Sequence, residues 1–422
     1  MLDVLFVHNN FPAQFGNLAR YLMAQPGVRV RAIATSTAAS IEGVETQRYK
    51  IAANDVSAHA FARRFDQECR RAEQVIYAAN AFRAQGFDPA LIYVHPGWGE
   101  ALPLRSLFPR AVIVVYAEFY YQPRGADVGF DPEFDRFGVD GEIRIALRNA
   151  STLLALADAD EIITPTKWQR DGFPKRMRAG MRVIHDGVDT DALTPTEKSD
   201  EEIVTYVARN LEPYRGFHSF MRALPKILLA RPKAQIHIVG GDSVSYGNPP
   251  RHHATWREAM IAELAGKLDM SRISFHGSLP YDRYIALLRR SRVHVYLTYP
   301  FVLSWSMLEA MALGLPVIGS DTAPVREVIE NNENGLLAPF GDHAAIADKL
   351  IDVLAAPARY KSMRDAARRT VVERYDLRRV ALPAQQALIA ERFPDFRSVQ
   401  DRSMNGFSSP PRVNSEAPSA SA

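Results

Sequence analysis

The most informative segment of the chain is Tyr-Pro-Phe-Val-Leu-Ser-Trp-Ser-Met-Leu-Glu-Ala-Met-Ala-Leu-Gly-Leu-Pro-Val-Ile, residues 299–318. It begins just after an apolar run of strand length at 293–297, and it ends inside a second such run at 316–320. The residues between the two runs are typical of a helix. A strand, a helix and another strand in this order form the repeating unit of a parallel sheet. The segment therefore predicts an α/β fold.

The same alternation continues on both sides of this segment. Further apolar runs in the second half of the chain occur at 203–208, 235–239 and 273–276. Those in the first half occur at 4–8, 28–34, 91–95, 112–117, 161–164 and 182–185. At 422 residues the chain exceeds what one hydrophobic core usually serves. We therefore predict two Rossmann-like domains whose parallel sheets face each other across a cleft.

Local composition sets the expected domain boundaries. Residues 191–202 are polar and lack apolar periodicity, which indicates a linker. The N-terminal domain is then expected at 1–190 and the C-terminal domain at 203–374. A last helical pattern covers 375–393. Residues 394–422 are rich in Ser, Pro, Asn and Arg and are expected to be disordered.

The overall composition excludes several classes of protein. The formal net charge of +3 is small for this length and does not imply a nucleic-acid partner. The single cysteine, Cys69, excludes an intramolecular disulfide and suits a reducing compartment. Residues 2–7 resemble a first strand more than a signal peptide, and no apolar run reaches the ~20 residues that span a bilayer. We expect a cytoplasmic protein with at most peripheral membrane contact.

The expected helix within 299–318 has features of an anion site. A helix that begins between Ser304 and Ser306 would direct unpaired backbone N–H groups and its positive dipole end into the cleft, which favours a diphosphate. Trp305 lies at the same helix start. The carboxylate of Glu309 follows just over one turn later and could reach the hydroxyls of a ribose. The alternative is that Ser304 only caps the helix and Glu309 only faces solvent.

The residues 308–317, Leu-Glu-Ala-Met-Ala-Leu-Gly-Leu-Pro-Val, resemble the donor-site signature of the family 4 glycosyltransferases. That signature reads Glu-Ala-Met-Ala-x-Gly-x-Pro-Val and has an acid eight residues before the Glu. Phe301 stands at the place of this acid, and Leu303-Ser304-Trp305 replaces the usual Gly-Phe-Gly, which suggests a bacterial sub-branch. Because Phe301 cannot accept hydrogen bonds from sugar hydroxyls, the donor is expected to be held by backbone N–H groups or to carry fewer hydroxyls there.

The resemblance implies a fold and an activity. The fold is GT-B, in which the C-terminal helix crosses back onto the first domain. The activity is transfer of a sugar, with retention, from a nucleoside diphosphate donor to an acceptor hydroxyl. The second domain would hold a UDP-, GDP- or ADP-sugar and the first domain the acceptor.

A second motif, Val-Ala-Arg-Asn-Leu-Glu-Pro-Tyr-Arg-Gly at 207–216, follows the first strand of the second domain. Its two cations, Arg209 and Arg215, flank one loop and could stabilise the charge on a departing diphosphate. In the family resemblance, Arg209 matches an invariant Arg and Arg215 takes the place of a Lys, so we expect both to be catalytic. The alternative is a pair of solvated arginines at a strand end.

Two glycine-containing turns of the second domain are expected to line the donor nucleotide. Gly240 and Gly241 end one strand, and the turn Gly277-Ser278-Leu279 follows the next. Glycine allows the backbone to approach a ligand closely. Such turns are common in Rossmann-like folds, and they gain weight from their order relative to the two stronger motifs.

Polar residues at strand ends of the first domain are candidates for the acceptor side. Gly16 lies in the loop after the first strand, which lacks the G-x-G-x-x-G pattern of nicotinamide and flavin enzymes. His95 and Glu118 each follow a later strand. His95 could orient a hydroxyl or manage its proton, although a structural histidine is about as common in such a place.

Cofactors and partners follow mostly from the resemblance. No metal is expected, because Asp158-Ala159-Asp160 resembles an ordinary helix-to-strand connection and the family stabilises its leaving group with cations and helix dipoles. The acceptor is expected to be a glycan or lipid-linked glycan of bacterial surface polysaccharide or glycolipid synthesis. The basic and aromatic stretch 167–178 could touch an anionic membrane, or it could be a solvated face with Trp168 and Phe173 packed inward.

Two other functions remain open at this point. A sugar-nucleotide epimerase on the same fold would need a pair of acids poised for proton abstraction, and no convincing pair is visible. A non-catalytic nucleotide-binding protein is favoured only by Phe301 and by the altered glycine loop.

Overall fold

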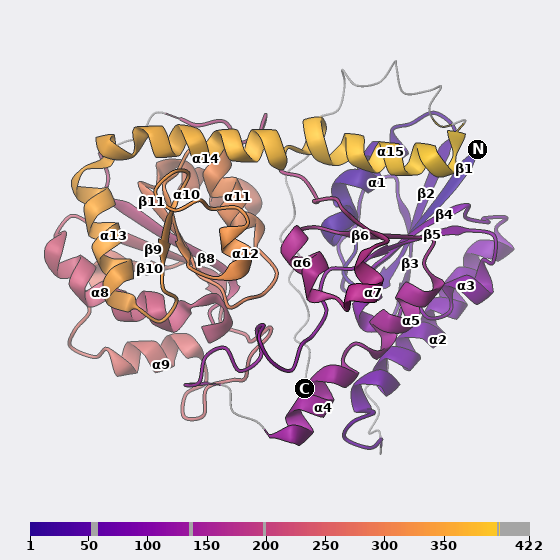
Figure 1. Ribbon diagram of the computed structural model, residues 1–422, viewed down its shortest axis with the longest axis horizontal. Helices are drawn as coiled ribbons and strands as arrows, with labels where there is room; N and C mark the ends of the chain where they lie inside the picture. The colour runs from indigo at the N-terminus through magenta and orange to yellow at the C-terminus, as the bar shows by residue number, and fades with distance from the viewer. Residues whose placement is uncertain (52–57, 135–137, 197–199, 395, 397–422) are drawn as a thin grey trace.

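The computed structural model describes residues 1–51, 58–134, 138–196, 200–394 and 396. These residues form two lobes that lie side by side, with the C-terminal helices running across both of them (Figure 1). The tail that was expected to be disordered, 394–422, lies outside the described residues except for positions 394 and 396.

The first domain contains a parallel sheet of seven strands among its described residues, in the order β3-β2-β1-β4-β5-β6-β7. The strands are β1 (Leu2–Val7), β2 (Val28–Thr35), β3 (Glu45–Tyr49), β4 (Leu91–Val94), β5 (Val112–Tyr116), β6 (Glu161–Thr164) and β7 (Met181–Val183). The strand order reverses between β1 and β4. Ligands of open α/β sheets bind beyond the carboxyl ends of the strands at such a point.

Apolar residues on both faces of this sheet bury it between two layers of helices. The helices are α1 (Gly16–Met23), α2 (Arg63–Ala84), α3 (Leu104–Leu107), α4 (Val139–Leu147), α5 (Ala150–Asp158), α6 (Lys167–Gly172) and α7 (Lys175–Arg178). Leu18 and Leu22 of α1 pack on one face of the sheet, while Val75 and Phe82 of α2 pack on the other. Parallel sheets are buried in this way because crossover helices cover both faces.

The second domain repeats the arrangement with six parallel strands among its described residues, in the order β10-β9-β8-β11-β12-β13. They are β8 (Ile203–Asn210), β9 (Gln235–Gly241), β10 (Ile273–Phe275), β11 (Val293–Tyr296), β12 (Val317–Ser320) and β13 (Leu336–Ala338). The helices are α8 (Phe217–Ala230), α9 (Trp256–Glu263), α10 (Tyr281–Arg290), α11 (Trp305–Ala312), α12 (Ala323–Arg326), α13 (His343–Ala355) and α14 (Lys361–Arg374). The order reverses between β8 and β11, so the two predicted donor motifs flank the switch point.

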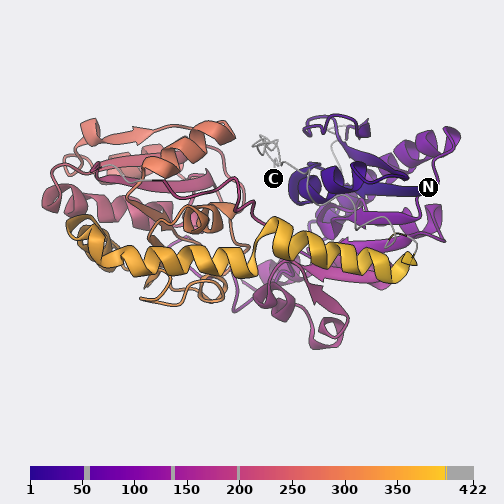
Figure 2. The same ribbon diagram turned by 90° about the horizontal axis from the view of Figure 1, so that it is seen from above.

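The expected helix at 375–393 is interrupted at its start. Asp376 lies just after the end of α14 and caps the next turn. Its side chain accepts hydrogen bonds from the backbone N–H groups of Arg378 and Arg379. A π-helical turn, Leu377–Ala381, then leads into α15 (Leu382–Arg392). Leu388 and Ile389 are buried in the core of the first domain. Viewed from above, α14 and α15 form one long arm that spans both lobes (Figure 2).

A segment of the first domain also reaches the second domain. After β5 the chain leaves its own sheet and passes beneath the other lobe before α4 (Figure 1). There the Asp127 carboxylate accepts a hydrogen bond from the Tyr214 hydroxyl at 2.6 Å, and Asp131 pairs with His218 at 3.1 Å. Residues 117–134 therefore connect the two domains on the side opposite to α15.

Candidate active site

Four polar side chains meet at the carboxyl edge of the first sheet, on either side of its switch point. The Gln14 amide donates to Oε1 of Glu118 at 2.6 Å, and its carbonyl oxygen lies 3.0 Å from Nε2 of His8. Oε2 of Glu118 lies 3.3 Å from Nε2 of His95. The structure thus brings together His95 and Glu118, which the sequence proposed for the acceptor side, and adds His8 and Gln14. Gly16, the third proposed residue, begins α1 close behind them.

The surroundings of His8 and Glu118 lower the pKa of both side chains. Burial, the neighbouring His95 and more distant Arg209 lower the pKa of His8 well below its usual range, so His8 is neutral at physiological pH. Burial alone would raise the pKa of Glu118, but hydrogen bonding and charge interactions with His95 outweigh it, and the pKa is lowered. Glu118 is therefore a charged acceptor of hydrogen bonds at neutral pH, and the His95 imidazole lies beside it.

Arg209 connects this cluster to the second domain. It lies exposed near the end of β8, yet its charge influences both His8 and Glu118 across the cleft. The end of β8 therefore lies within electrostatic range of the carboxyl edge of the first sheet.

Arg215 is held differently, in a buried cage under the loop between β11 and α11. Its Nη1 donates to the Thr298 hydroxyl at 3.0 Å and to the Val302 carbonyl at 2.8 Å, and it lies 3.3 Å from the Tyr296 hydroxyl. The same Tyr296 hydroxyl accepts from the backbone N–H of Ser304 at 2.7 Å. Tyr296 thus joins a fixed cation to the start of α11, where the Ser304 hydroxyl caps the helix, the role that the alternative interpretation gave it. Cation and helix N-terminus together favour an anion.

The loop that carries Phe301 is aromatic rather than acidic. The Phe301 ring is buried. Its centre lies 4.7 Å from the ring centre of Phe119, from the first domain, and 4.7 Å from that of Tyr246. The Arg215 guanidinium lies 5.5 Å from the centre of the same ring, within cation–π range. This part of the second domain packs an aromatic ring where the family signature has a carboxylate.

Glu309 is buried and already has partners inside the second domain. Its carboxylate accepts hydrogen bonds from the Tyr281 hydroxyl at 3.1 Å and from the Tyr284 hydroxyl at 2.8 Å, both on α10. The view that it only faces solvent is therefore wrong. The two tyrosines fix the carboxylate oxygens near the turn 277–279, which leads into α10.

The glycine turns are explained in part by packing of the chain on itself. A Cβ at Gly240 would lie 2.8 Å from Leu211, and one at Gly241 would lie 2.6 Å from the Asn210 side chain. At Gly240 a Cβ would also lie 2.9 Å from the Ala208 carbonyl oxygen, so the neighbouring loop requires this glycine, whereas at Gly241 the contact is with the end of a side chain that can move. Gly277 adopts a positive φ of 60° with nothing near its Cβ position, and Ser278 beside it is exposed. Leu279 packs partly into the core.

A buried acid that the sequence did not single out organises the loop after β9. Glu212 is fully buried, and its carboxylate accepts backbone N–H groups of Ser245, Tyr246 and Gly247 at distances between 3.0 and 3.3 Å. Burial raises the pKa of Glu212, although these donors oppose the shift. The contact holds the Tyr246 ring over Arg215, at 5.3 Å from the guanidinium.

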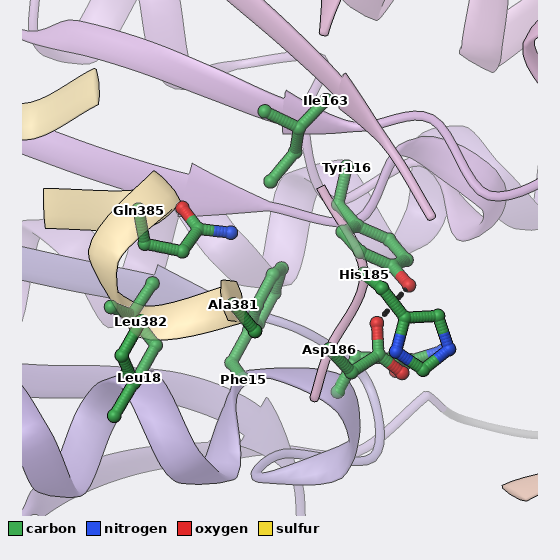
Figure 3. Close-up of a pocket in the computed structure, with 10 residues that line it drawn as sticks. Phe15, Leu18, Tyr116, Ile163, His185, Asp186, Ala381, Leu382 and Gln385 are labelled. Carbon is green, nitrogen blue, oxygen red and sulfur yellow. Dashed lines mark hydrogen bonds between the residues drawn. The ribbon is translucent and has the colours of Figure 1, made fainter. Parts of the chain in front are cut away.

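Asp186 links the domains at the bottom of the cleft. Its Oδ1 accepts from the Tyr116 hydroxyl at 2.5 Å, and its Oδ2 accepts from the indole N–H of Trp305 at 2.8 Å. Figure 3 shows Tyr116 and Asp186 beside a small pocket between α1, the strand ends and α15. That pocket, about 20 Å³, has room for a water molecule but not for a sugar. Trp305, a proposed donor contact, thus serves to join the domains.

The start of the basic stretch 167–178 contacts the second domain. The Glu327 carboxylate accepts the backbone N–H groups of Lys167 and Trp168 at 2.8 and 2.6 Å. Phe173 is buried, as expected for a face packed inward, and membrane contact stays a prediction.

Within the described ranges, no helix is long and apolar enough to cross a membrane. Nor do those residues contain a group of three or more His, Cys, Asp or Glu side chains suited to a metal ion.

Comparison with known families decides the class of the two domains. Residues 26–193 match the model described as glycosyl transferase family 4 group, and residues 190–370 match the model described as glycosyl transferases group 1. The chain carries two glycosyltransferase domains. Between them these domains contain His95, Glu118, Arg209, Arg215 and Glu309.

Curated relatives of the glycosyltransferase domains act in several ways. The chain is 25% identical over 223 residues to D-inositol 3-phosphate glycosyltransferase of Mycobacteroides abscessus, covering 50% of this chain and 47% of the relative. It is 30% identical over 181 residues to phosphatidyl-myo-inositol mannosyltransferase of Mycobacterium leprae, covering 40% and 43%. The chain thus spans about half the length of the curated relatives it matches.

Solved structures share the fold over nearly the whole chain. Sucrose-phosphate synthase from Thermosynechococcus elongatus has a TM-score of 0.70 at 19% identity, covering 94% of this chain and 100% of that one. Anabaena HepE, solved in complex with UDP, has a TM-score of 0.63 at 16% identity, covering 94% and 100%. The two glycosyltransferase domains therefore form a GT-B fold, as predicted.

Proposed function

We propose that the protein transfers a sugar from a nucleoside diphosphate sugar to an acceptor hydroxyl with retention of configuration. The observation that carries this proposal is the link from Arg215 through the Tyr296 hydroxyl to Ser304 at the start of α11. It places a buried cation beside a helix N-terminus at the switch point of the second sheet. A diphosphate carries the charge and the oxygen atoms that such a site favours.

The donor is oriented by groups on either side of this anion site. Glu309, fixed by Tyr281 and Tyr284, accepts hydrogen bonds from the ribose hydroxyls, and the turn at 277–279 lies against the base. The sugar points towards the first domain and meets the ring of Phe301. Because that ring offers no acceptor, it suits a sugar face with few hydroxyls, on a UDP, GDP or ADP carrier.

The reaction exchanges one bond of the anomeric carbon for another on the same face of the sugar. The bond to the diphosphate oxygen breaks, the acceptor oxygen bonds to the anomeric carbon, and the hydroxyl proton passes to a diphosphate oxygen. Arg209 and Arg215 stabilise the charge that develops on the diphosphate, the task that a metal ion performs in other transferases. His95 and Glu118 orient the acceptor hydroxyl, and closure of the cleft excludes water.

The proposed cellular role rests on the resemblance to the family. We propose a cytoplasmic enzyme of bacterial surface polysaccharide or glycolipid synthesis, with a glycan or lipid-linked glycan as acceptor. The mannosyltransferase and the inositol phosphate glycosyltransferase among its relatives support transfer to a hydroxyl of a polar acceptor.

The first test needs no knowledge of the acceptor. Purified protein is mixed with UDP-, GDP- and ADP-sugars, and both the thermal shift and the slow release of nucleoside diphosphate are measured. Selective stabilisation by one donor, together with release of its diphosphate and of free sugar whose configuration at carbons 2 to 5 is unchanged, supports the transferase. Formation of an epimerised sugar nucleotide would indicate an isomerase instead. Absence of binding by every donor would remove the proposed donor site.

A further inference from the structure

A second, larger cavity lies at the carboxyl edge of the first sheet, next to the acceptor cluster. It has a volume of about 110 Å³ and lies between the chain that follows β5 and helix α6. Its lining includes three aromatic and three polar side chains: Phe119, Tyr120, Trp168, Gln122, Gln169 and Asp171. Nothing in the proposed reaction has so far used this space.

The cavity is joined directly to residues of the reaction site. The Gln169 side chain donates to the backbone carbonyl of Glu118 at 2.5 Å, so one wall is attached to the acceptor cluster. On the other side, the centre of the Phe119 ring lies 6.1 Å from the centre of the Trp168 ring and 4.7 Å from the centre of the Phe301 ring. A molecule in the cavity is therefore separated from the donor loop by the thickness of one aromatic ring.

The lining identifies the chemical class of the occupant. Phe119 and Trp168 offer ring faces, and the half-buried indole of Trp168 also carries a donor N–H. The Gln122 side-chain amide donates one N–H to the Gly172 carbonyl at 3.0 Å, which fixes the orientation of this amide in the cavity lining. Asp171 is exposed at the rim. A pyranose ring combines C–H faces that pack on aromatic rings with hydroxyls that can pair with the Gln122 amide and the exposed Asp171 carboxylate, each of which has one protein partner of its own.

We propose that this cavity binds a pyranose ring of the acceptor, with the reacting hydroxyl directed at His95 and Glu118. This inference rests on the proposed transferase function and deepens it, because it assigns the reacting sugar ring of the proposed glycan acceptor to one cavity of the first domain.

The second domain takes part in forming the cavity. The Glu327 carboxylate holds the backbone N–H groups at positions 167 and 168, which fixes the first turn of α6 and with it the Trp168 ring. Glu327 is thus a positioning residue for the acceptor. The acceptor site is complete only when the two domains are docked.

The test uses the full chain with the donor that the panel selects. The acceptor probes are octyl α- and β-glycosides of glucose, mannose, galactose and N-acetylglucosamine, with 1-octanol as the matched non-glycoside. Nucleoside diphosphate release is measured as a function of probe concentration for the wild type and for Trp168→Ala, Gln122→Ala and Glu327→Gln. The control is Trp256→Ala, because Trp256 lies on α9 of the second domain, outside the cavity.

The expected result is that at least one glycoside, but not octanol, accelerates diphosphate release in the wild type. Trp168→Ala and Gln122→Ala then raise the KM for that glycoside about tenfold, the equivalent of about 1.4 kcal/mol, while the KM for donor and the release without acceptor stay unchanged. Glu327→Gln raises the same KM, and Trp256→Ala does not. An unchanged KM for the donor in both Trp168→Ala and Gln122→Ala would show that these variants are folded.

Several results would overturn the inference. Equal KM values for the glycoside in Trp168→Ala, Gln122→Ala and the wild type would exclude the cavity as the acceptor site. Acceleration by octanol as strong as by its glycosides would show that no sugar ring is recognised. If the wild type neither binds a donor nor releases a diphosphate, the proposed function fails, and the cavity inference fails with it.

Discussion

The indole N–H of Trp305 donates to Oδ2 of Asp186 at 2.8 Å, and this hydrogen bond ties the first residue of α11 to the chain that follows β7. Asp186 completes the link by accepting from Tyr116 at the end of β5. The start of α11, where we propose that the diphosphate binds, is therefore fixed relative to the strand edge of the other domain. Loosening this contact should change how the domains dock.

Trp305→Phe removes the donor N–H while keeping a ring in place. We expect a loss of about 1 kcal/mol in the free energy of unfolding, typical of one hydrogen bond, and faster amide hydrogen exchange at both ends of α15. The matched control is Trp256→Phe, because the Trp256 indole donates to the Asn248 carbonyl at 3.0 Å within the second domain. Equal exchange at α15 in both variants would show that Trp305 does not couple the domains.

Arg209→Ala tests the cation that faces the cleft. Because Arg209 is exposed, its removal should leave the melting temperature unchanged. Donor turnover should fall about 10²- to 10³-fold, the usual cost of losing one group that stabilises transition-state charge. Arg110→Ala, at a side chain that is 90% exposed in the first domain, is the control. Unchanged nucleotide affinity and turnover in Arg209→Ala would remove Arg209 from the mechanism.

Most strands of both sheets could be predicted from apolar runs, and the two that were missed, β3 and β13, lie at sheet edges. Buried parallel strands such as β4, Leu-Ile-Tyr-Val, are apolar throughout because both faces are covered. The edge strand β3, Glu-Thr-Gln-Arg-Tyr, buries only Tyr49, so its residues carry no such signal. The other edge strand that the runs missed, β13, has only three residues. β13 is apolar, Leu-Leu-Ala, but it is too short to stand out as a run.

The candidate site could be predicted only as far as strand ends and one helix start reveal it. His95 and Glu118 follow strands, so their position at the sheet edge could be inferred. His8 directly follows β1 and had the same signal. The partners of Glu309 and Glu212 lie 25 to 35 residues away in sequence, on α10 and in the loop after β9. Such contacts depend on how elements pack, which no local pattern encodes.

Glu309→Gln tests the ribose contact. The variant keeps the shape of the side chain but weakens the hydrogen bonds from ribose hydroxyls by removing the negative charge. We expect the Kd of the nucleoside diphosphate to rise about tenfold, as for the loss of about 1.4 kcal/mol, while the Kd of inorganic pyrophosphate stays unchanged. Calorimetric titration with both ligands measures this difference.

The control for this variant is Glu333→Gln, at an exposed position of the second domain. It should change neither Kd. A parallel rise in the Kd values of the nucleoside diphosphate and pyrophosphate in Glu309→Gln would mean that the carboxylate supports the helix start rather than the ribose.

His294 predicts a dependence of stability on pH. It is fully buried on β11 with Nδ1 lying 3.1 Å from the Thr205 hydroxyl, and burial lowers its pKa to about 3. Between pH 6.5 and this value the unfolded chain binds a proton that the folded chain does not, so stability falls as the pH falls. On this account the protein should be about 1.4 kcal/mol less stable at pH 5.5 than at pH 7.5 through His294 alone, since one pKa unit corresponds to about 1.4 kcal/mol.

Urea unfolding of the wild type and of His294→Gln at both pH values measures the contribution of His294. Loss of packing in His294→Gln lowers its stability equally at both pH values, so only the difference between the two pH values reports on the proton. We expect that difference to shrink by about 1.4 kcal/mol in His294→Gln and to stay as in the wild type in His343→Gln, at an exposed position of α13. An unchanged pH difference in His294→Gln would mean that the folded protein admits a proton at His294 within this range.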